Sequence, residues 1–108
     1  MNTTRIVKEI SQDEYYDVIL WYKDKIVVSS HALDVLSLSQ RRTFKPEDLI
    51  SMLLNDKPSG IGLQKNGNYA VYFKTGDGFR KIIISVKSMR LEIVTFMNTD
   101  GMPNLKRI

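Results

Sequence analysis

The segment IGLQKNGNYAVYFKTGDGFRKIIISVKSMRLEIVTFM, residues 61–97, alternates apolar and polar residues in four short runs. Alternation with a period of two is typical of β-strands, and the runs cover residues 61–65, 69–75, 79–87 and 90–97. Asn66-Gly67-Asn68 separates the first two runs and is a strong hairpin signal, and Gly76-Asp77-Gly78 marks a second turn. The segment therefore predicts a four-stranded antiparallel meander.

The residues before this segment change to a helical period, and the first helix is expected over residues 12–24. Ser11 and Glu14 form a capping-box pattern at its start. One face of this helix is apolar and carries Tyr15, Val18, Ile19 and Tyr22. A β-hairpin is the alternative, because residues 16–21 and 26–28 are rich in β-prone side chains.

Two further helices are expected before residue 55. Residues 26–30 are extended, and Ser29 or Ser30 caps a second helix that begins near His31. Thr43 caps a third helix, with Pro46 in its first turn. Helices followed by antiparallel strands predict an α+β domain, with the helices packed on one face of the four-stranded sheet.

Length and composition place this arrangement in a single domain of residues 1–108, with residues 98–108 as a flexible tail. Hydrophobic residues make up 43% of the chain, which is typical of a globular protein. The absence of cysteine and the presence of one histidine exclude disulfides, a cysteine zinc site and a multi-histidine metal site within one chain. No apolar run is long enough to span a bilayer or to act as a secretory signal, so we expect a cytoplasmic protein without membrane association or cofactor.

The positive charge lies in the second half of the chain. Residues 1–59 carry a net charge of −1, whereas residues 60–108 carry +5. Such asymmetry indicates an anionic partner, with nucleic acid as the first candidate. A solvated, solubilising surface is the alternative.

Strand alternation assigns each residue of the meander to one of two faces. The face toward the helices is expected to hold Tyr69, Val71, Phe73, Ile82, Ile84, Val86, Leu91, Ile93 and Met97. The opposite face, called the open face here, is expected to hold cations with aromatic rings between them, namely Lys74, Lys81, Lys87, Arg90, Tyr72 and Phe96. Cations contact phosphates and aromatic rings stack on bases, so this face predicts a nucleic-acid surface.

Short motifs also occur between residues 26 and 97: IVVSSHAL at 26–33, RRT at 41–43, PEDLI at 46–50, NGNY at 66–69, FR at 79–80 and IVT at 93–95. Together they resemble a family of small domains related to RelE-like and BrnT-like toxins, within the barnase/colicin/RelE group of metal-independent ribonucleases. The chain departs from that pattern at Asp34 and Val35, where the family has an arginine in the helix.

The resemblance implies a RelE-like fold with RNA on the open face and cleavage without a metal. A base then takes the 2′-hydroxyl proton, cations stabilise the phosphate, and an acid protonates the leaving oxygen. It assigns His31 to acid or base chemistry and Arg80 to phosphate binding. Strand alternation, however, places Arg80 toward the helices. Lys81 and Arg90 are therefore the candidates on the open face for its phosphate-binding role. Glu92, the one carboxylate expected on the basic face, is either the base or an ion-pair partner.

Each of the remaining candidate site residues has a functional and a structural interpretation. Arg41 and Arg42 are phosphate contacts or a solvated pair, His31 is catalytic or hydrogen-bonded to backbone, and Thr95 matches the family's last-strand threonine or is a packing residue. The residues expected to bind nucleic acid without catalysis are Arg41, Arg42, Tyr72, Lys74, Lys87 and Phe96.

Two functional hypotheses follow. The first is an RNA-directed protein, acting as a metal-independent endoribonuclease toxin with an acidic partner protein such as an antitoxin. The second is a non-catalytic module that binds nucleic acid or protein on the same fold. The second is favoured by the single histidine and by the missing family arginine.

Overall fold

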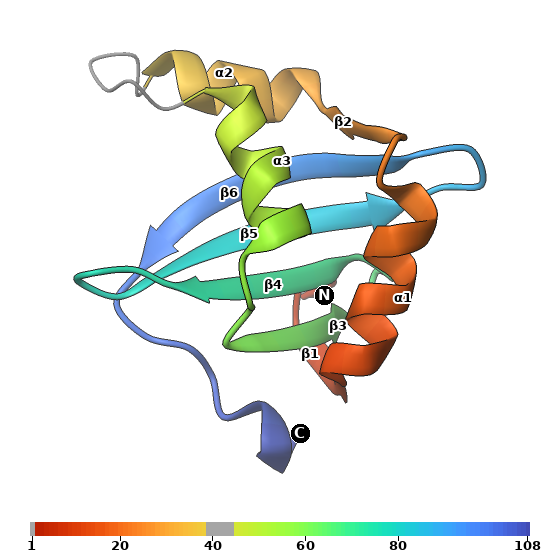
Figure 1. Ribbon diagram of the computed structural model, residues 1–108. Helices are drawn as coiled ribbons and strands as arrows, with labels where there is room; N and C mark the ends of the chain where they lie inside the picture. Colours follow the sequence, from red (N-terminus) through yellow and green to blue (C-terminus); the bar gives the residue numbers. More distant parts are fainter. Residues whose placement is uncertain (1, 39–44) are drawn as a thin grey trace.

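Residues 2–38 and 45–108, which the computed structural model describes, form an α+β domain with three α-helices on one face of a six-stranded sheet (Figure 1). The predicted α+β class is confirmed. Thr43, Arg41 and Arg42 lie outside the described residues. In chain order the elements are β1 (Ile6–Ile10), α1 (Gln12–Tyr22), β2 (Ile26–Val28), α2 (Ser30–Leu38), α3 (Pro46–Asn55), β3 (Gly60–Gln64), β4 (Tyr69–Lys74), β5 (Phe79–Val86), β6 (Leu91–Thr99) and the 3₁₀ helix η1 (Leu105–Arg107).

The sheet differs from the predicted one by two additional strands, in the order β1-β3-β4-β5-β6-β2. The four predicted strands form its centre as an antiparallel meander. At one edge β1 pairs antiparallel with β3, and at the other β2 pairs parallel with β6. The prediction of a purely antiparallel four-stranded sheet is therefore wrong, because both added strands pair with segments far away in the sequence.

A β-bulge in β6 changes the predicted faces. Ile83 pairs with Thr95, but the next residue, Ile84, pairs with Ile93, so Val94 is an extra residue in β6. Such an insertion reverses the alternation beyond it. Phe96 consequently lies in the core beneath the helices and is 8% exposed, whereas Met97 lies on the open face and is 42% exposed. The predicted positions of these two side chains are both wrong.

The first helix is confirmed against the hairpin alternative. The Ser11 hydroxyl accepts a hydrogen bond from the Glu14 amide at 3.1 Å, as the capping pattern predicts. The Tyr15 hydroxyl donates to the Leu53 carbonyl at 2.8 Å, and the Tyr22 hydroxyl donates to the Lys87 carbonyl at 2.6 Å. These bonds fix α1 to α3 and to the turn between β5 and β6.

The other two helices complete the covered face. The Ser29 hydroxyl accepts from the Ala32 amide at the start of α2 and donates to the Val94 carbonyl in β6. At the start of α3, the Lys45 amide donates to the Asp48 carboxylate at 2.7 Å, and Pro46 occupies the first turn as predicted. Within the described residues, no helix is both long and apolar enough to cross a membrane.

The two ends of the chain cover part of the open face. A Cβ atom added at Gly62 would lie 2.6 Å from the Ile6 side chain, and one added at Gly60 would lie 2.7 Å from the side chains of Leu105 and Met102. Both strand glycines therefore leave room for apolar side chains of the termini. The segment 98–108, expected as a tail, begins with the last two residues of β6, and its Leu105 is 3% exposed.

Candidate functional site

The open face is only partly basic. Lys74 and Lys81 lie on it as predicted. Lys74 is the last residue of β4, and Lys81 lies near the start of β5. The Lys74 ammonium lies 5.1 Å from the ring centroid of Phe79, and the Lys81 ammonium lies 5.6 Å from that of Tyr72. Tyr72 is 2% exposed, and this burial raises the pKa of its phenol. The predicted exposed ring surface of Tyr72 and Phe96 is therefore wrong, since both rings are buried.

The predicted cations at the far end of the sheet form a separate group. Lys87 and Arg90 are exposed in the turn between β5 and β6. The Arg90 guanidinium lies 3.5 Å from the Glu92 carboxylate, which places these two residues in an ion pair. This geometry corresponds to the ion-pair interpretation of Glu92.

Arg80 lies on the helix side of the sheet, as strand alternation predicts. Its Nε donates to the Asn98 side-chain oxygen at 3.2 Å, and its Nη1 lies 3.9 Å from the Met52 sulfur on α3. Burial lowers the pKa of this guanidinium, while the nearby Asp48 carboxylate opposes that shift. Arg80 is thus held between the end of β5 and α3.

The predicted catalytic residues are not gathered into one site, although two of them, Arg90 and Glu92, form an ion pair. His31 is exposed in the first turn of α2, which packs along β6. Glu92 pairs in register with Ser85, five residues along β5 from Arg80, a separation of about 17 Å at strand geometry. Lys81 lies on the opposite face of the sheet from Arg80. No single phosphate can therefore contact His31, Arg80 and Glu92 together in this arrangement.

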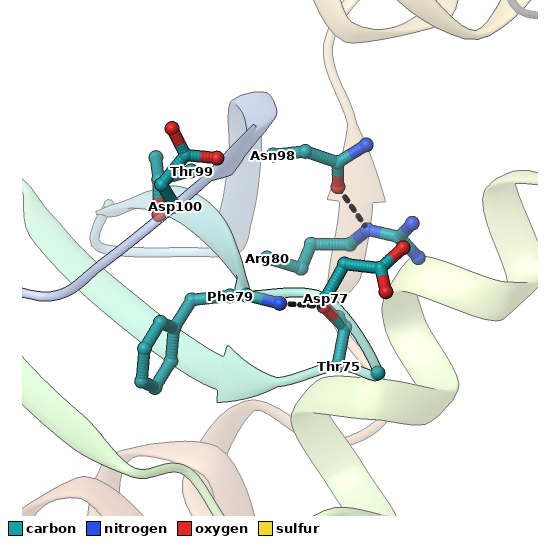
Figure 2. Close-up of a pocket in the computed structure, with 9 residues that line it drawn as sticks. Thr75, Asp77, Phe79, Arg80, Asn98, Thr99 and Asp100 are labelled. Carbon is teal, nitrogen blue, oxygen red and sulfur yellow. Dashed lines mark hydrogen bonds between the residues drawn. The ribbon is translucent and has the colours of Figure 1, made fainter.

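A first pocket, called the rim pocket, lies at the turn between β4 and β5 and has a volume of about 330 Å³ (Figure 2). Arg80 and Asn98 meet on one side of it through their hydrogen bond. Asp77 and Asp100 also line it, so its two carboxylates outnumber the one guanidinium. Among the described residues, no group of three or more His, Cys, Asp or Glu side chains is placed to hold a metal ion. The charge of the rim pocket does not favour an anionic ligand.

A second pocket of about 330 Å³, called the open-face pocket, lies on the face without helices. One of its lining residues, Ile83 of β5, pairs in register with Thr95 of β6, which also lines it. Lys81 is the one charged side chain among the described residues that line it. The full lining is Thr4, Gln64, Asn66, Asn68, Lys81, Ile83, Val94, Thr95 and Met97.

Gln64 is the most unusual member of this lining. It is the last residue of β3, is 2% exposed, and its Oε1 has no hydrogen-bond partner within the described structure. A buried polar atom without a partner costs about 1–3 kcal/mol. Such atoms in folded proteins call for a specific explanation, of which a ligand is one.

Sequence reasoning missed most of this pocket. The sequence indicates a turn and the NGNY motif at Asn66 and Asn68, and it does not by itself predict ligand binding by either residue or by Gln64. The alternation of 61–65 does place Gln64 on the same face as Gly62, which is the signal that identifies it. Alternation also predicts Val94 on the open face, whereas the contribution of Thr95 depends on the bulge, which has no comparable signal.

Searches against protein-family models, curated proteins and solved structures return no match for this chain. The resemblance to RelE-like toxins stays a prediction from short motifs.

Proposed function

We propose that this protein is a non-catalytic RNA-binding module that takes single-stranded RNA on its open face. The observation that carries the proposal is the lining of the open-face pocket, where the Lys81 ammonium joins neutral amides and hydroxyls without a carboxylate among the described lining residues. Ammonium groups contact phosphates, and amide side chains pair with base edges. An RNA chain offers both groups at neighbouring positions.

The two lysines of this face support a backbone contact. Lys81 pairs in register with Tyr72, which is two residues from Lys74, so the two lysines are diagonal neighbours on adjacent strands. Diagonal neighbours lie about 7–8 Å apart at their backbones. Long side chains at that spacing can reach successive phosphates of one strand. The net charge of +5 over residues 60–108 strengthens attraction to such a polyanion.

The shape of the site supports a single strand. A base can enter a pocket of this kind only when it is unpaired, and sequence-specific RNA recognition mostly uses unpaired bases for that reason. Three amide side chains, those of Gln64, Asn66 and Asn68, line the pocket. Amides carry both donors and acceptors and so match the edges of bases.

The separation of the predicted catalytic residues supports binding without cleavage. Metal-independent cleavage needs a base and an acid within hydrogen-bond reach of one phosphate. His31 is exposed on α2, and Glu92 is paired with Arg90 at the end of the sheet. The open-face pocket itself contains no acid–base pair among the described residues.

The test is fluorescence anisotropy with a short, labelled single-stranded RNA of mixed sequence, measured over a range of salt concentrations. Lys81→Met and Lys74→Met remove one charge each from the open face. Lys23→Met is the matched control, because Lys23 is exposed at the end of α1 on the helix side. Each open-face variant should weaken binding and reduce the slope of log affinity against log salt by about 0.7. Lys23→Met should leave the slope unchanged.

Two results would overturn the proposal. One is the absence of RNA binding at low salt, and the other is an equal effect of Lys81→Met and Lys23→Met. Gel analysis of the same RNA after long incubation should show intact strands. Cleavage that disappears in His31→Ala would show that the protein is an enzyme and would reject the non-catalytic part.

A further inference from the structure

The three most exposed large apolar side chains of the described structure lie at one corner of the molecule, called the corner patch here. Leu20 and Trp21, near the end of α1, are 66% and 72% exposed, and Met89, in the turn between β5 and β6, is 73% exposed. This turn adjoins the end of α1 (Figure 1), because the Tyr22 hydroxyl donates to the Lys87 carbonyl at 2.6 Å. Single apolar side chains are ordinary on a surface, whereas a group of large ones marks an interaction site.

The exposed side of α1 has two apolar side chains between two carboxylates. In chain order these residues are Asp17, Leu20, Trp21 and Asp24, and all four are exposed. Residues at the spacing i, i+3, i+4 and i+7 share one side of a helix. α1 ends at Tyr22, and the helical dihedral angles of Lys23 continue the turn toward Asp24. This half of the corner patch is therefore acidic.

The other half of the corner patch is basic. Lys87 and Met89 are exposed in the turn between β5 and β6. Lys25 adjoins this turn, because its carbonyl accepts from the Leu91 amide at 3.0 Å, and its ammonium lies 5.9 Å from the centroid of the Trp21 ring. Neither lysine forms an ion pair within the described structure.

We infer that the corner patch binds a second copy of this chain through a two-fold contact. A two-fold interface brings one surface against an identical surface, so that surface must be complementary to itself. An acidic half beside a basic half meets this condition. With the axis at the apolar centre, Asp17 and Asp24 of each copy face the basic half of the other. The exposed tryptophan and methionine then meet between the charges, and both residue types are enriched at protein–protein interfaces.

The balance of charge in the corner patch disfavours the other occupants. Its two carboxylates and two unpaired lysines cancel, and Arg90, in the same turn, is already paired with Glu92. The patch therefore has no general attraction for a polyanion such as RNA or for an anionic lipid surface. A base stacked on Trp21 would also bring its phosphates close to the carboxylates of α1.

Dimer formation at the corner patch does not depend on the proposed RNA binding. The open-face pocket has no residue in common with the corner patch, so the dimer presents two such pockets. Two linked sites bind one polymer more tightly than two separate sites. The dimer is therefore tested in the absence of RNA.

The first arm of the test measures molar mass by light scattering during size-exclusion chromatography, from micromolar to millimolar protein. The wild type should have twice the mass of a monomer at high concentration and dissociate on dilution. A variant with both Trp21→Ser and Met89→Ser should be a folded monomer, because both positions are exposed. Leu33→Ser is the control, since Leu33 is 42% exposed on α2, and it should dimerise as the wild type does. A monomeric wild type, a double variant that still dimerises, or a monomeric Leu33→Ser overturns the inference.

The second arm reverses the charge of each half of the corner patch. One variant carries Asp17→Lys and Asp24→Lys and has a wholly basic patch, and the other carries Lys25→Glu and Lys87→Glu and has a wholly acidic one. Each variant alone should be monomeric, because like charges then meet across the two-fold contact. An equimolar mixture of the two should form a heterodimer that salt weakens. A mixture that stays monomeric, or a single variant that dimerises, overturns the inference.

The third arm uses Trp21 as a reporter, because it is the one tryptophan of the chain. Its fluorescence emission should move to shorter wavelength as the mass doubles, with the same midpoint. A doubled mass without this shift would place the interface elsewhere and overturn the inference. A shift caused by single-stranded RNA, or by phosphatidylglycerol vesicles, in a protein that stays monomeric would assign the patch to that ligand and also overturn it.

Discussion

The Lys81 ammonium lies 5.6 Å from the centroid of the Tyr72 ring, and the two residues are register partners across β4 and β5. Because Tyr72 is 2% exposed, its ring cannot stack on a base. It lies instead beneath the cation, and contacts of this kind contribute about 0.5–2 kcal/mol. A lysine restricted in this way loses less side-chain freedom when it binds a phosphate. The buried Tyr72 ring thus restricts the Lys81 side chain and in this way favours phosphate binding at the open-face pocket.

The packing of the N-terminal segment over β3 gives the first prediction. A Cβ atom at Gly62 would meet three atoms of the Ile6 side chain, the nearest at 2.6 Å. Gly62→Ala should therefore lower the free energy of unfolding by about 1–3 kcal/mol, as overpacking does. Gly76→Ala is the control, because nothing lies within 4 Å of its Cβ position.

Denaturant unfolding of both variants and of Gly62→Ala with Ile6→Ala checks this prediction. In the Ile6→Ala background the cost of Gly62→Ala should shrink, since the clash partner is gone. Equal stability of Gly62→Ala and Gly76→Ala would show that Ile6 does not pack on β3.

Ser29 joins a helix start to the bulged strand and gives the second prediction. Its hydroxyl accepts from the Ala32 amide at 3.1 Å and donates to the Val94 carbonyl at 2.8 Å. Ser29→Ala removes both bonds and should cost about 1–2 kcal/mol of unfolding free energy. Ser30→Ala, at the exposed neighbouring position, should change stability much less in the same thermal melts. A similar loss in both variants would contradict the assignment of Ser29 as the cap.

The sequence predicts the local features of this fold better than the distant ones. Hairpin signals and alternation identify β3, β4 and β5 and the faces of Val71, Phe73 and Ile82, because both patterns depend on neighbouring residues. The pairing of β1 with β3 depends on contacts across more than fifty residues, and the composition of Ile6–Ile10 is not specific to a strand. No local pattern predicts it.

In the candidate site too, the sequence predicts the features that depend on neighbouring residues and misses those that depend on distant contacts. Alternation places Lys74 and Lys81 on the open face as predicted. The bulge at Val94 moves Phe96 to the core, and a bulge is a property of the strand pair, which one strand's sequence does not reveal. The unpartnered oxygen of Gln64 is likewise visible only in the folded chain.

The buried phenol of Tyr15 gives the third prediction, which concerns pH. Burial raises the pKa of Tyr15, with smaller contributions from Tyr16 and Asp56. The unfolded phenol ionises near pH 10, below the folded one, so alkali favours the unfolded state. The stability that the protonated phenol contributes is fully present below about pH 10 and is lost as the pH rises above it.

Comparison with Tyr15→Phe isolates this effect from the other tyrosines. Near neutral pH the variant should be less stable by about 0.5–1.5 kcal/mol, because the hydrogen bond to the Leu53 carbonyl is lost. The difference should shrink as urea unfolding is repeated at pH values above about 10. If the difference in unfolding free energy between the wild type and Tyr15→Phe stays constant with pH, the Tyr15 phenol has the same pKa in the folded and unfolded states.

Arg80 and Lys81 are consecutive cations on opposite faces of β5, and their contrast gives the last prediction. Arg80 is hydrogen-bonded to Asn98 on the helix side, whereas Lys81 lines the open-face pocket. Arg80→Met and Lys81→Met remove the same charge from neighbouring positions, so any effect of net charge on RNA affinity is equal in the two. Lys81→Met should weaken binding and reduce the salt slope, because a phosphate contact is lost. Arg80→Met should lower the melting temperature through the loss of its Asn98 bond while the salt slope stays that of the wild type. If Arg80→Met reduces the slope as much as Lys81→Met, RNA crosses the rim of the sheet and the assignment of the open face is wrong.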